Sequence, residues 1–156
     1  MKDNLQCRFW NLFSILFLVI LFIYPAINYS DLPDTIPSHY NFWGVPDDYS
    51  SKNTIWILPV IGLLLYVTLT LISNKLIKPK IGDPQYEYHK AQLFLQRLLF
   101  FIMISFFYIV YTTIQIAMGS MEGLPRYFSS IFILLILFMV ISFSIQQTLN
   151  KAHDNQ

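Results

Sequence analysis

The residues best suited to chemistry lie in one stretch, LPDTIPSHYNFWGVPDDYSSK, from Leu32 to Lys52. His39 stands there among nearby aspartates, and imidazole with carboxylates suits several divalent metals. The spacing supplies neither an HExxH pattern nor a second nearby His to fix ligand geometry. We therefore expect no metal or other cofactor, with hydrogen bonding inside the loop as the main role of these groups and metal binding as the alternative. The aspartates concerned are Asp31, Asp34, Asp47 and Asp48.

Recognition of a ligand or partner is a further role for this stretch. His39, Asn41, Trp43 and Asp47 offer donors, acceptors and an aromatic anchor within a short span. Trp is frequent among interface hot spots, and His both donates and accepts at neutral pH. No activated Ser or Cys nucleophile is apparent, so we expect no catalytic residue and a protein that is not an enzyme.

Three prolines stiffen the same stretch. Pro33, Pro37 and Pro46 each fix their own φ and bias the preceding residue toward extended backbone. Gly44 follows a short polar and aromatic run and suggests a tight turn. The sequence predicts an irregular but ordered loop over residues 31–52 that caps one end of the molecule.

The rest of the chain predicts the elements that hold this loop. Of the 156 residues, 55% are hydrophobic and 12% charged, whereas a soluble domain has about 25% charged residues. A helix needs about 20 apolar residues to cross a membrane. Four uncharged runs meet this length, and we predict an all-α integral membrane protein, an up-and-down bundle forming a single domain over residues 1–156. The predicted transmembrane helices are about 9–27, 54–73, 91–117 and 127–149.

The composition of the bilayer-spanning runs limits the functions that we expect. They hold no carboxylate, although ion-coupled transporters usually need an intramembrane acid or His. Gln115 is the costliest polar residue in lipid, so we expect it to face the bundle or a membrane partner, including a second copy of the chain. A small transporter, channel or accessory subunit of a membrane complex remains the rival function. A net charge of +1 does not indicate the basic surface that nucleic-acid binding requires.

Lys and Arg near the helix ends predict the orientation. With the N-terminus inside, eight of the ten cations face the cytoplasm, and only Lys52 and Arg126 face outward. We therefore place both termini and the connector from Lys75 to Arg97 in the cytoplasm, the first helix as an uncleaved anchor, and the proline-rich loop outside. The predicted location is the cytoplasmic (inner) membrane of a bacterium.

The loop also resembles a known pattern. LPDTIPSHYNFWGVPDDYSSK is similar to LPxxIPxHFNxxGxPDxxxSK, the hallmark of a bacterial membrane domain of unknown function that also forms the N-terminal part of SdpI-like immunity proteins. Tyr40 stands where Phe is usual. The segment from Gln96 to Phe128 looks like the third helix and following turn of four-helix members. The resemblance implies immunity to a secreted toxin or envelope signalling, with an extracellular peptide or toxin meeting the outward loop.

Overall fold

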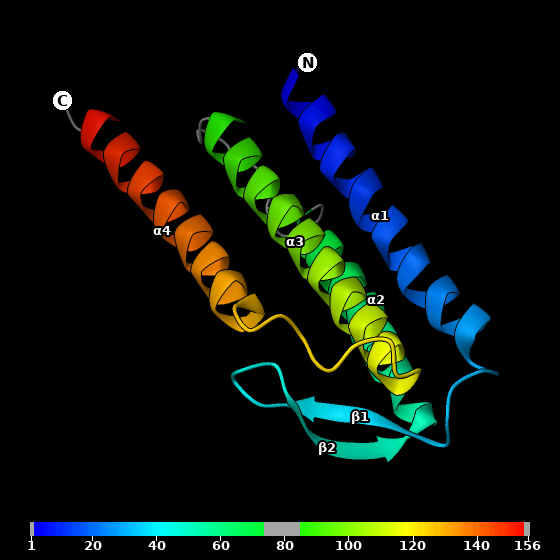
Figure 1. The fold of residues 1–156 in the computed structure, drawn as a ribbon. Helices are drawn as coiled ribbons and strands as arrows, with labels where there is room; N and C mark the ends of the chain where they lie inside the picture. Colours follow the sequence, from blue (N-terminus) through cyan, green and yellow to red (C-terminus); the bar gives the residue numbers. More distant parts are fainter. Residues whose placement is uncertain (1, 74–84, 155–156) are drawn as a thin grey trace.

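The computed structural model describes residues 2–73 and 85–154. Four helices and one hairpin follow one another along the chain (Figure 1). The elements are α1 (Lys2–Asn28), β1 (Thr35–Tyr40), β2 (Pro46–Ser51), the short 3-10 helix η1 (Lys52–Trp56), α2 (Ile57–Leu71), α3 (Gln85–Ala117) and α4 (Phe128–Asp154). Residues 75–84 of the predicted cytoplasmic connector lie outside the described residues, and the rest of it, from Gln85 to Arg97, belongs to α3.

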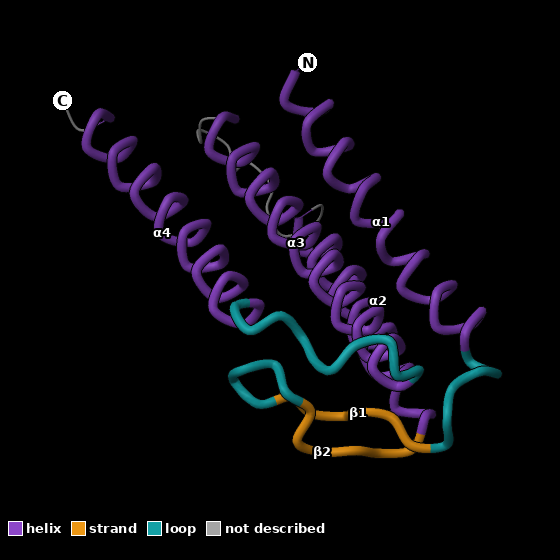
Figure 2. The backbone as a smooth tube through the Cα atoms, in the orientation of Figure 1, coloured by secondary structure: helices purple, strands orange, loops and turns teal. Residues whose placement is uncertain are grey.

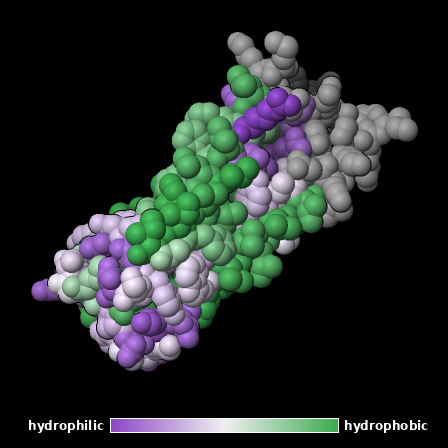
Figure 3. Space-filling view, turned by 90° about the vertical axis from the view of Figure 1, so that its right-hand side faces the viewer, coloured by the Kyte–Doolittle hydropathy of each residue, from purple (hydrophilic) through white to green (hydrophobic). Residues whose placement is uncertain are grey.

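Within the described residues, four helices are long and apolar enough to cross a membrane, which indicates a multi-pass membrane protein and agrees with the four predicted spans. The spans are Leu5–Asn28, Lys52–Leu71, His89–Ala117 and Phe128–Ile145. A broad hydrophobic band separates the hydrophilic hairpin from the hydrophilic residues at the other end (Figure 3). Both termini lie at the end opposite the hairpin (Figure 1). We call these the terminal end and the hairpin end.

The helices run up and down as predicted, but they do not form an evenly packed bundle. α3 packs along α1 and, less extensively, along α2, whereas α4 touches α3 sparingly and no residue of its span is buried. Apolar residues on α4 have little reason to close on their neighbours, because lipid solvates them as well as another helix does. The predicted four-helix arrangement is therefore confirmed in part: α1, α2 and α3 pack together, and α4 lies along α3 with a smaller contact.

The core lies along α3. Leu99, Met103 and Ile114 are fully buried there, together with Leu21 of α1. Gln115 donates from Nε2 to the hydroxyl of Tyr24 at 3.0 Å, which confirms that this amide faces a neighbouring helix. A polar side chain among apolar helices thus gains a partner, which offsets the cost of holding it away from water.

The capping segment is a β-hairpin (Figure 2), so the prediction of an all-α fold with an irregular loop is wrong at this point. Its two strands pair antiparallel. Proline is excluded from central strands because it lacks an N–H, but in a two-stranded ribbon both outer edges are free. Pro37 and Pro46 therefore fit into the strands, and the extended bias that suggested a stiff loop favours this ribbon equally.

Candidate functional site

The hairpin has an irregular register that re-aims its side chains. Thr35 pairs with Ser51 and Ile36 with Ser50, but the pairing shifts on both sides of His39. Such bulges leave one residue unpaired and increase the local twist. At the end of β1 that leads into the turn, the side chains of His39 and Tyr40 therefore do not follow the regular alternation between the two faces of the hairpin.

The turn between the strands is organised by Asn41. Its Oδ1 accepts from the backbone N–H groups of Trp43 at 2.9 Å and Val45 at 3.1 Å. The backbone N–H of Gly44 donates to the carbonyl of Asn41 at 2.9 Å, and Gly44 takes a φ of +81°. The side-chain oxygen of Asn41 thus accepts hydrogen bonds from the backbone of the turn, and these bonds occupy it within the hairpin.

The hairpin tip docks on the segment between α3 and α4, backbone against backbone. The N–H of Leu124 donates to the carbonyl of Gly44 at 2.8 Å. A Cβ at Gly44 would lie 2.5 Å from the carbonyl oxygen of Leu124, and one at Gly123 would lie 2.7 Å from that of Gly44. Two glycines therefore permit a contact that side chains would block.

Two side-chain contacts attach the hairpin to α3 and to the segment between α3 and α4. The hydroxyl of Tyr40 lies 2.6 Å from Oγ1 of Thr113, which is buried on α3. Burial raises the pKa of Tyr40, outweighing the lowering by Thr113, so the phenol keeps its proton at neutral pH and remains available for this hydrogen bond. At the tip, the guanidinium of Arg126 lies 5.2 Å from the ring centroid of Trp43, within the range of a cation–π contact.

A cavity of about 660 Å³ opens beneath the hairpin. Its apolar walls come from the hairpin, η1, α2, α3, α4 and the segment before α4, and include Ile36, Ile55, Val110 and Leu124. Polar groups that also line it include Ser38, His39, Asp48, Ser50 and Thr113. An apolar hollow with a few polar groups is the usual form of a ligand site, and this volume falls in the ~300–1,000 Å³ range of such sites.

The polar groups form two separate hydrogen-bonded sets. Nδ1 of His39 lies 2.5 Å from Oδ1 of Asp47. On β1 and β2, Ser50 donates to Ser38 at 3.1 Å, and Ser38 donates to Asp48 at 3.4 Å. Within the described part of the chain, no hydrogen bond is found between His39 and either serine.

The aspartates near His39 do not gather around it. Asp34 pairs instead with Lys52, whose Nζ lies 3.7 Å from Oδ1. Among residues 2–73 and 85–154, no three His, Cys, Asp or Glu side chains come together as a metal-ligand group. His39 with Asp47 supplies at most two ligands, whereas zinc sites in proteins use three or four protein ligands.

A range that includes the hairpin matches a family of known proteins. Residues 16–63 match the family described as a domain of unknown function (DUF1648). A protein described as "Uncharacterized protein" from Archaeoglobus fulgidus is 30% identical over 61 residues, which is 39% of this chain and 33% of that relative. The similarity thus spans about a third of the length of the archaeal relative. No solved structure matches.

The chain resembles DUF1648 over that range. The DUF1648-like range runs from α1 through the hairpin to the first turns of α2, so it contains most of the site but none of α3 or α4. Neither description names an activity, and the link to SdpI-like proteins stays a prediction.

The predicted site residues separate into three groups in the structure. His39 and Asp47 form an exposed pair, and only His39 of the two lines the cavity. Asn41 supports the turn, and Trp43 projects at the tip with 55% of its surface exposed. Of the predicted structural residues, Gly44 makes the tip contact, Pro37 and Pro46 lie in the strands, and Pro33 lies before β1.

Sequence reasoning missed the residues that α3 and the following segment supply. Thr113, Leu124 and Phe128 all line the cavity. A glycine can mark the close approach of another backbone, and Gly123 in GSMEGLPR is such a position in the structure. Nothing in the local sequence pairs Thr113 with Tyr40.

Proposed function

We propose that this chain is a non-enzymatic bacterial membrane protein that gives immunity to a secreted peptide toxin by binding it at an outward-facing hairpin. The observation that carries the proposal is the combination of an exposed apolar tip with a cavity at its base. Phe42, Trp43 and Val45 are each more than half exposed at the tip, although water surrounds the end of the molecule beyond the membrane. The resemblance of the hallmark to SdpI-like proteins supports toxin immunity as the class, with envelope signalling as the related alternative.

The site suits an amphipathic peptide better than a small polar ligand. An apolar side chain of the peptide would enter the cavity beside Ile36 and Val110, and its backbone would meet the polar groups of Ser38 and His39. Trp43 would cover a second apolar side chain. The hairpin is fixed by the Leu124 and Tyr40 contacts before binding, so little ordering entropy is lost when the peptide arrives.

A binding role is favoured over hydrolysis by the separation of the polar groups. A nucleophilic Ser needs a base within hydrogen-bond reach, and the base needs an orienting group. His39 has an orienting group in Asp47, but the hydrogen bonds of Ser38 and Ser50 lead to Asp48. The residues therefore serve recognition in this proposal.

The proposal also requires that the hairpin faces outward, and cysteine labelling tests this. A cysteine in place of Ser50, in a Cys7→Ser background, is expected to react with a membrane-impermeant thiol reagent in intact cells. Native Cys7 lies at the terminal end and is expected to stay unlabelled until the membrane is opened. Labelling of Cys7 and protection of position 50 in intact cells would reverse the orientation and remove the proposed route to an extracellular toxin.

Replacing both His39 and Asp47 with Ala is expected to abolish or strongly reduce protection against a candidate toxin. Their side chains are 67% and 42% exposed, so the pair is expected to contribute less than about 1 kcal/mol to the free energy of unfolding. The measurements are survival under toxin, protein level in the membrane and thermal unfolding of purified protein. Asp34→Ala is the matched control, because it removes a fully exposed carboxylate from the same hairpin region, at its other end.

Lost protection at unchanged protein level and stability, with Asp34→Ala still protective, supports recognition at His39 and Asp47. Full protection by the double variant contradicts it. A large loss of stability would assign the pair to the folding of the hairpin.

A further inference from the structure

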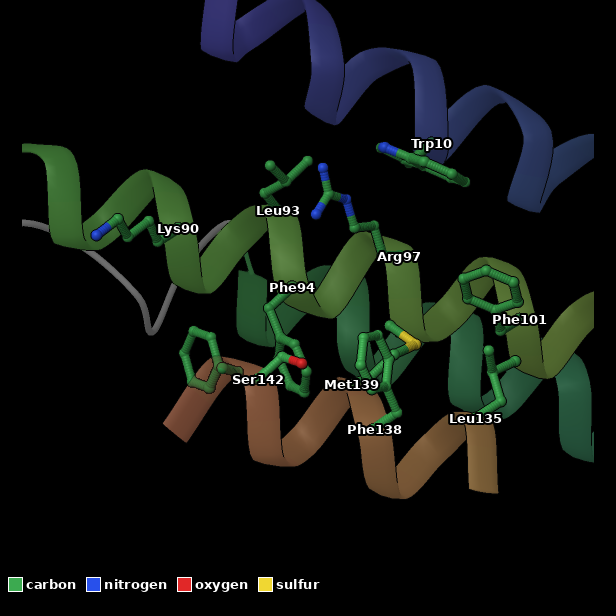
Figure 4. Close-up of a pocket in the computed structure, with 11 residues that line it drawn as sticks. Trp10, Lys90, Leu93, Phe94, Arg97, Phe101, Leu135, Phe138, Met139 and Ser142 are labelled. Carbon is green, nitrogen blue, oxygen red and sulfur yellow. The ribbon is translucent and has the colours of Figure 1, made fainter. Parts of the chain in front are cut away.

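A second groove lies between α3 and α4 (Figure 4). The α3 residues that line it, from Lys90 to Phe101, are in the half of that helix nearer the terminal end. The volume of the groove is about 320 Å³. α3 supplies Lys90, Phe94 and Arg97 to its lining, and Trp10 of α1 borders it beside Arg97. The opposite wall is α4. The groove is therefore open to the hydrocarbon on one side and cationic near the membrane surface.

Two aromatic stacks hold α4 against α3, and both residues of the first stack also line the groove. Phe94 stacks on Phe143 with ring centroids 4.4 Å apart, and Tyr108 stacks on Phe128 at 5.1 Å. Between these contacts the α4 wall is mainly apolar, and Phe138 is 70% exposed. A chain of methylene groups in this space would contact mainly apolar side chains, with Ser142 as a polar residue of the α4 wall.

The two cations that line the groove share a helix face. Lys90 and Arg97 are seven residues apart on α3, about two helical turns, and both line the groove. Arg97 is exposed and lies 5.8 Å from the ring centroid of Trp10. Within the described part of the chain, Arg97 takes part in neither ion pair. Its planar guanidinium is thus available to bind a phosphate through two parallel hydrogen bonds.

We propose that this groove binds one anionic phospholipid, with an acyl chain between α3 and α4 and the phosphate at Arg97 and Lys90. Basic pockets between transmembrane helices are typical sites for anionic headgroups. Charge selects the occupant: two cations at the surface favour a headgroup with net negative charge over a zwitterionic one, whose own cation would lie near Arg97. The apolar side chains that line the rest of the groove favour a lipid, which has acyl chains, over a free phosphate. The site stands apart from the hairpin and does not depend on its proposed function.

The test measures lipid binding to the full chain by native mass spectrometry in a neutral detergent. The probes are phosphatidylglycerol and phosphatidylcholine with identical acyl chains. We expect phosphatidylglycerol to bind more tightly, and Arg97→Gln to weaken it about fivefold, which corresponds to about 1 kcal/mol per cation near the surface. The Lys90→Gln, Arg97→Gln double variant is expected to lose on the order of 25-fold. Arg8→Gln removes the same charge at the same end, outside the groove, and should leave the affinity unchanged.

A second variant tests the acyl-chain part of the site without changing charge. Ser142 lines the α4 wall, and Ser142→Phe would fill the groove beside Met139. We expect it to weaken phosphatidylglycerol at least fivefold at unchanged thermal stability. Equal binding of the two lipids, equal losses from Arg8→Gln and Arg97→Gln, or displacement of the lipid by inorganic phosphate would each overturn the proposal.

Discussion

Replacing Gly44 with Ala is expected to detach the hairpin tip and lower the free energy of unfolding by about 2–4 kcal/mol. The φ of +81° disfavours any residue with a Cβ, at a cost of about 1–2 kcal/mol. The new Cβ would also lie 2.5 Å from the carbonyl oxygen of Leu124, which is backbone and cannot rotate away. The hydrogen bond from Leu124 to Gly44 must lengthen, which adds about 1 kcal/mol.

Gly119→Ala provides the matched control for this prediction. Gly119 has a φ of +74°, but a Cβ added there would meet nothing within 4 Å, so this substitution tests the backbone cost alone. Thermal unfolding in detergent and hydrogen exchange of the hairpin amides measure both variants. We expect Gly44→Ala to cost at least about 1 kcal/mol more than Gly119→Ala and to raise exchange in the hairpin. Equal effects of the two variants would show that the tip contact does not stabilise the fold.

The transmembrane spans could be predicted because a single quantity, the thickness of the hydrocarbon, determines their length. The charge-free runs located all four helices, but the predicted ends were too short where polar residues continue a helix into water. α1 begins at Lys2 rather than near Phe9, and α4 continues to Asp154. α2 begins later than predicted, because Lys52–Trp56 first forms a 3-10 helix in which Ser51 accepts from the N–H of Asn53.

The packing between helices was less predictable from sequence. Hydrophobicity shows that a segment enters the membrane but not which helix it touches, since lipid and another apolar helix solvate it alike. Thus α4 looked like a bundle member, although its neighbours bury none of its span.

In the candidate site, the local signals were informative and the long-range ones were not. The Gly44 turn was predicted from its sequence, and the structure shows the positive φ that only a glycine adopts readily. The strands were missed because the three prolines were taken to indicate a stiff, irregular loop, although the extended backbone that they favour also suits strands with a free edge. The contact of Tyr40 with Thr113 joins positions 73 residues apart, and no local pattern specifies such a pair.

Ile36→Ala is expected to have the second large effect, because this side chain seats the hairpin on the helices. Ile36 is 1% exposed and belongs to the same buried cluster as Ile55 and Val110. The hairpin lies beyond the membrane span, so lifting it would expose Ile36 to water rather than to lipid. Burial therefore stabilises the hairpin through the full hydrophobic effect, unlike contacts between helices inside the bilayer.

The expected loss is about 2–4 kcal/mol, the range for removing a buried Ile or Leu side chain. Val45→Ala is the control: Val45 is on the same hairpin but 52% exposed, and its truncation should change stability by less than about 0.5 kcal/mol. Thermal unfolding and hairpin hydrogen exchange distinguish the two. If Ile36→Ala and Val45→Ala changed the stability equally, burial of Ile36 would not be what holds the hairpin on the helices. The tip contact at Gly44 and the Tyr40 hydrogen bond would then hold it alone.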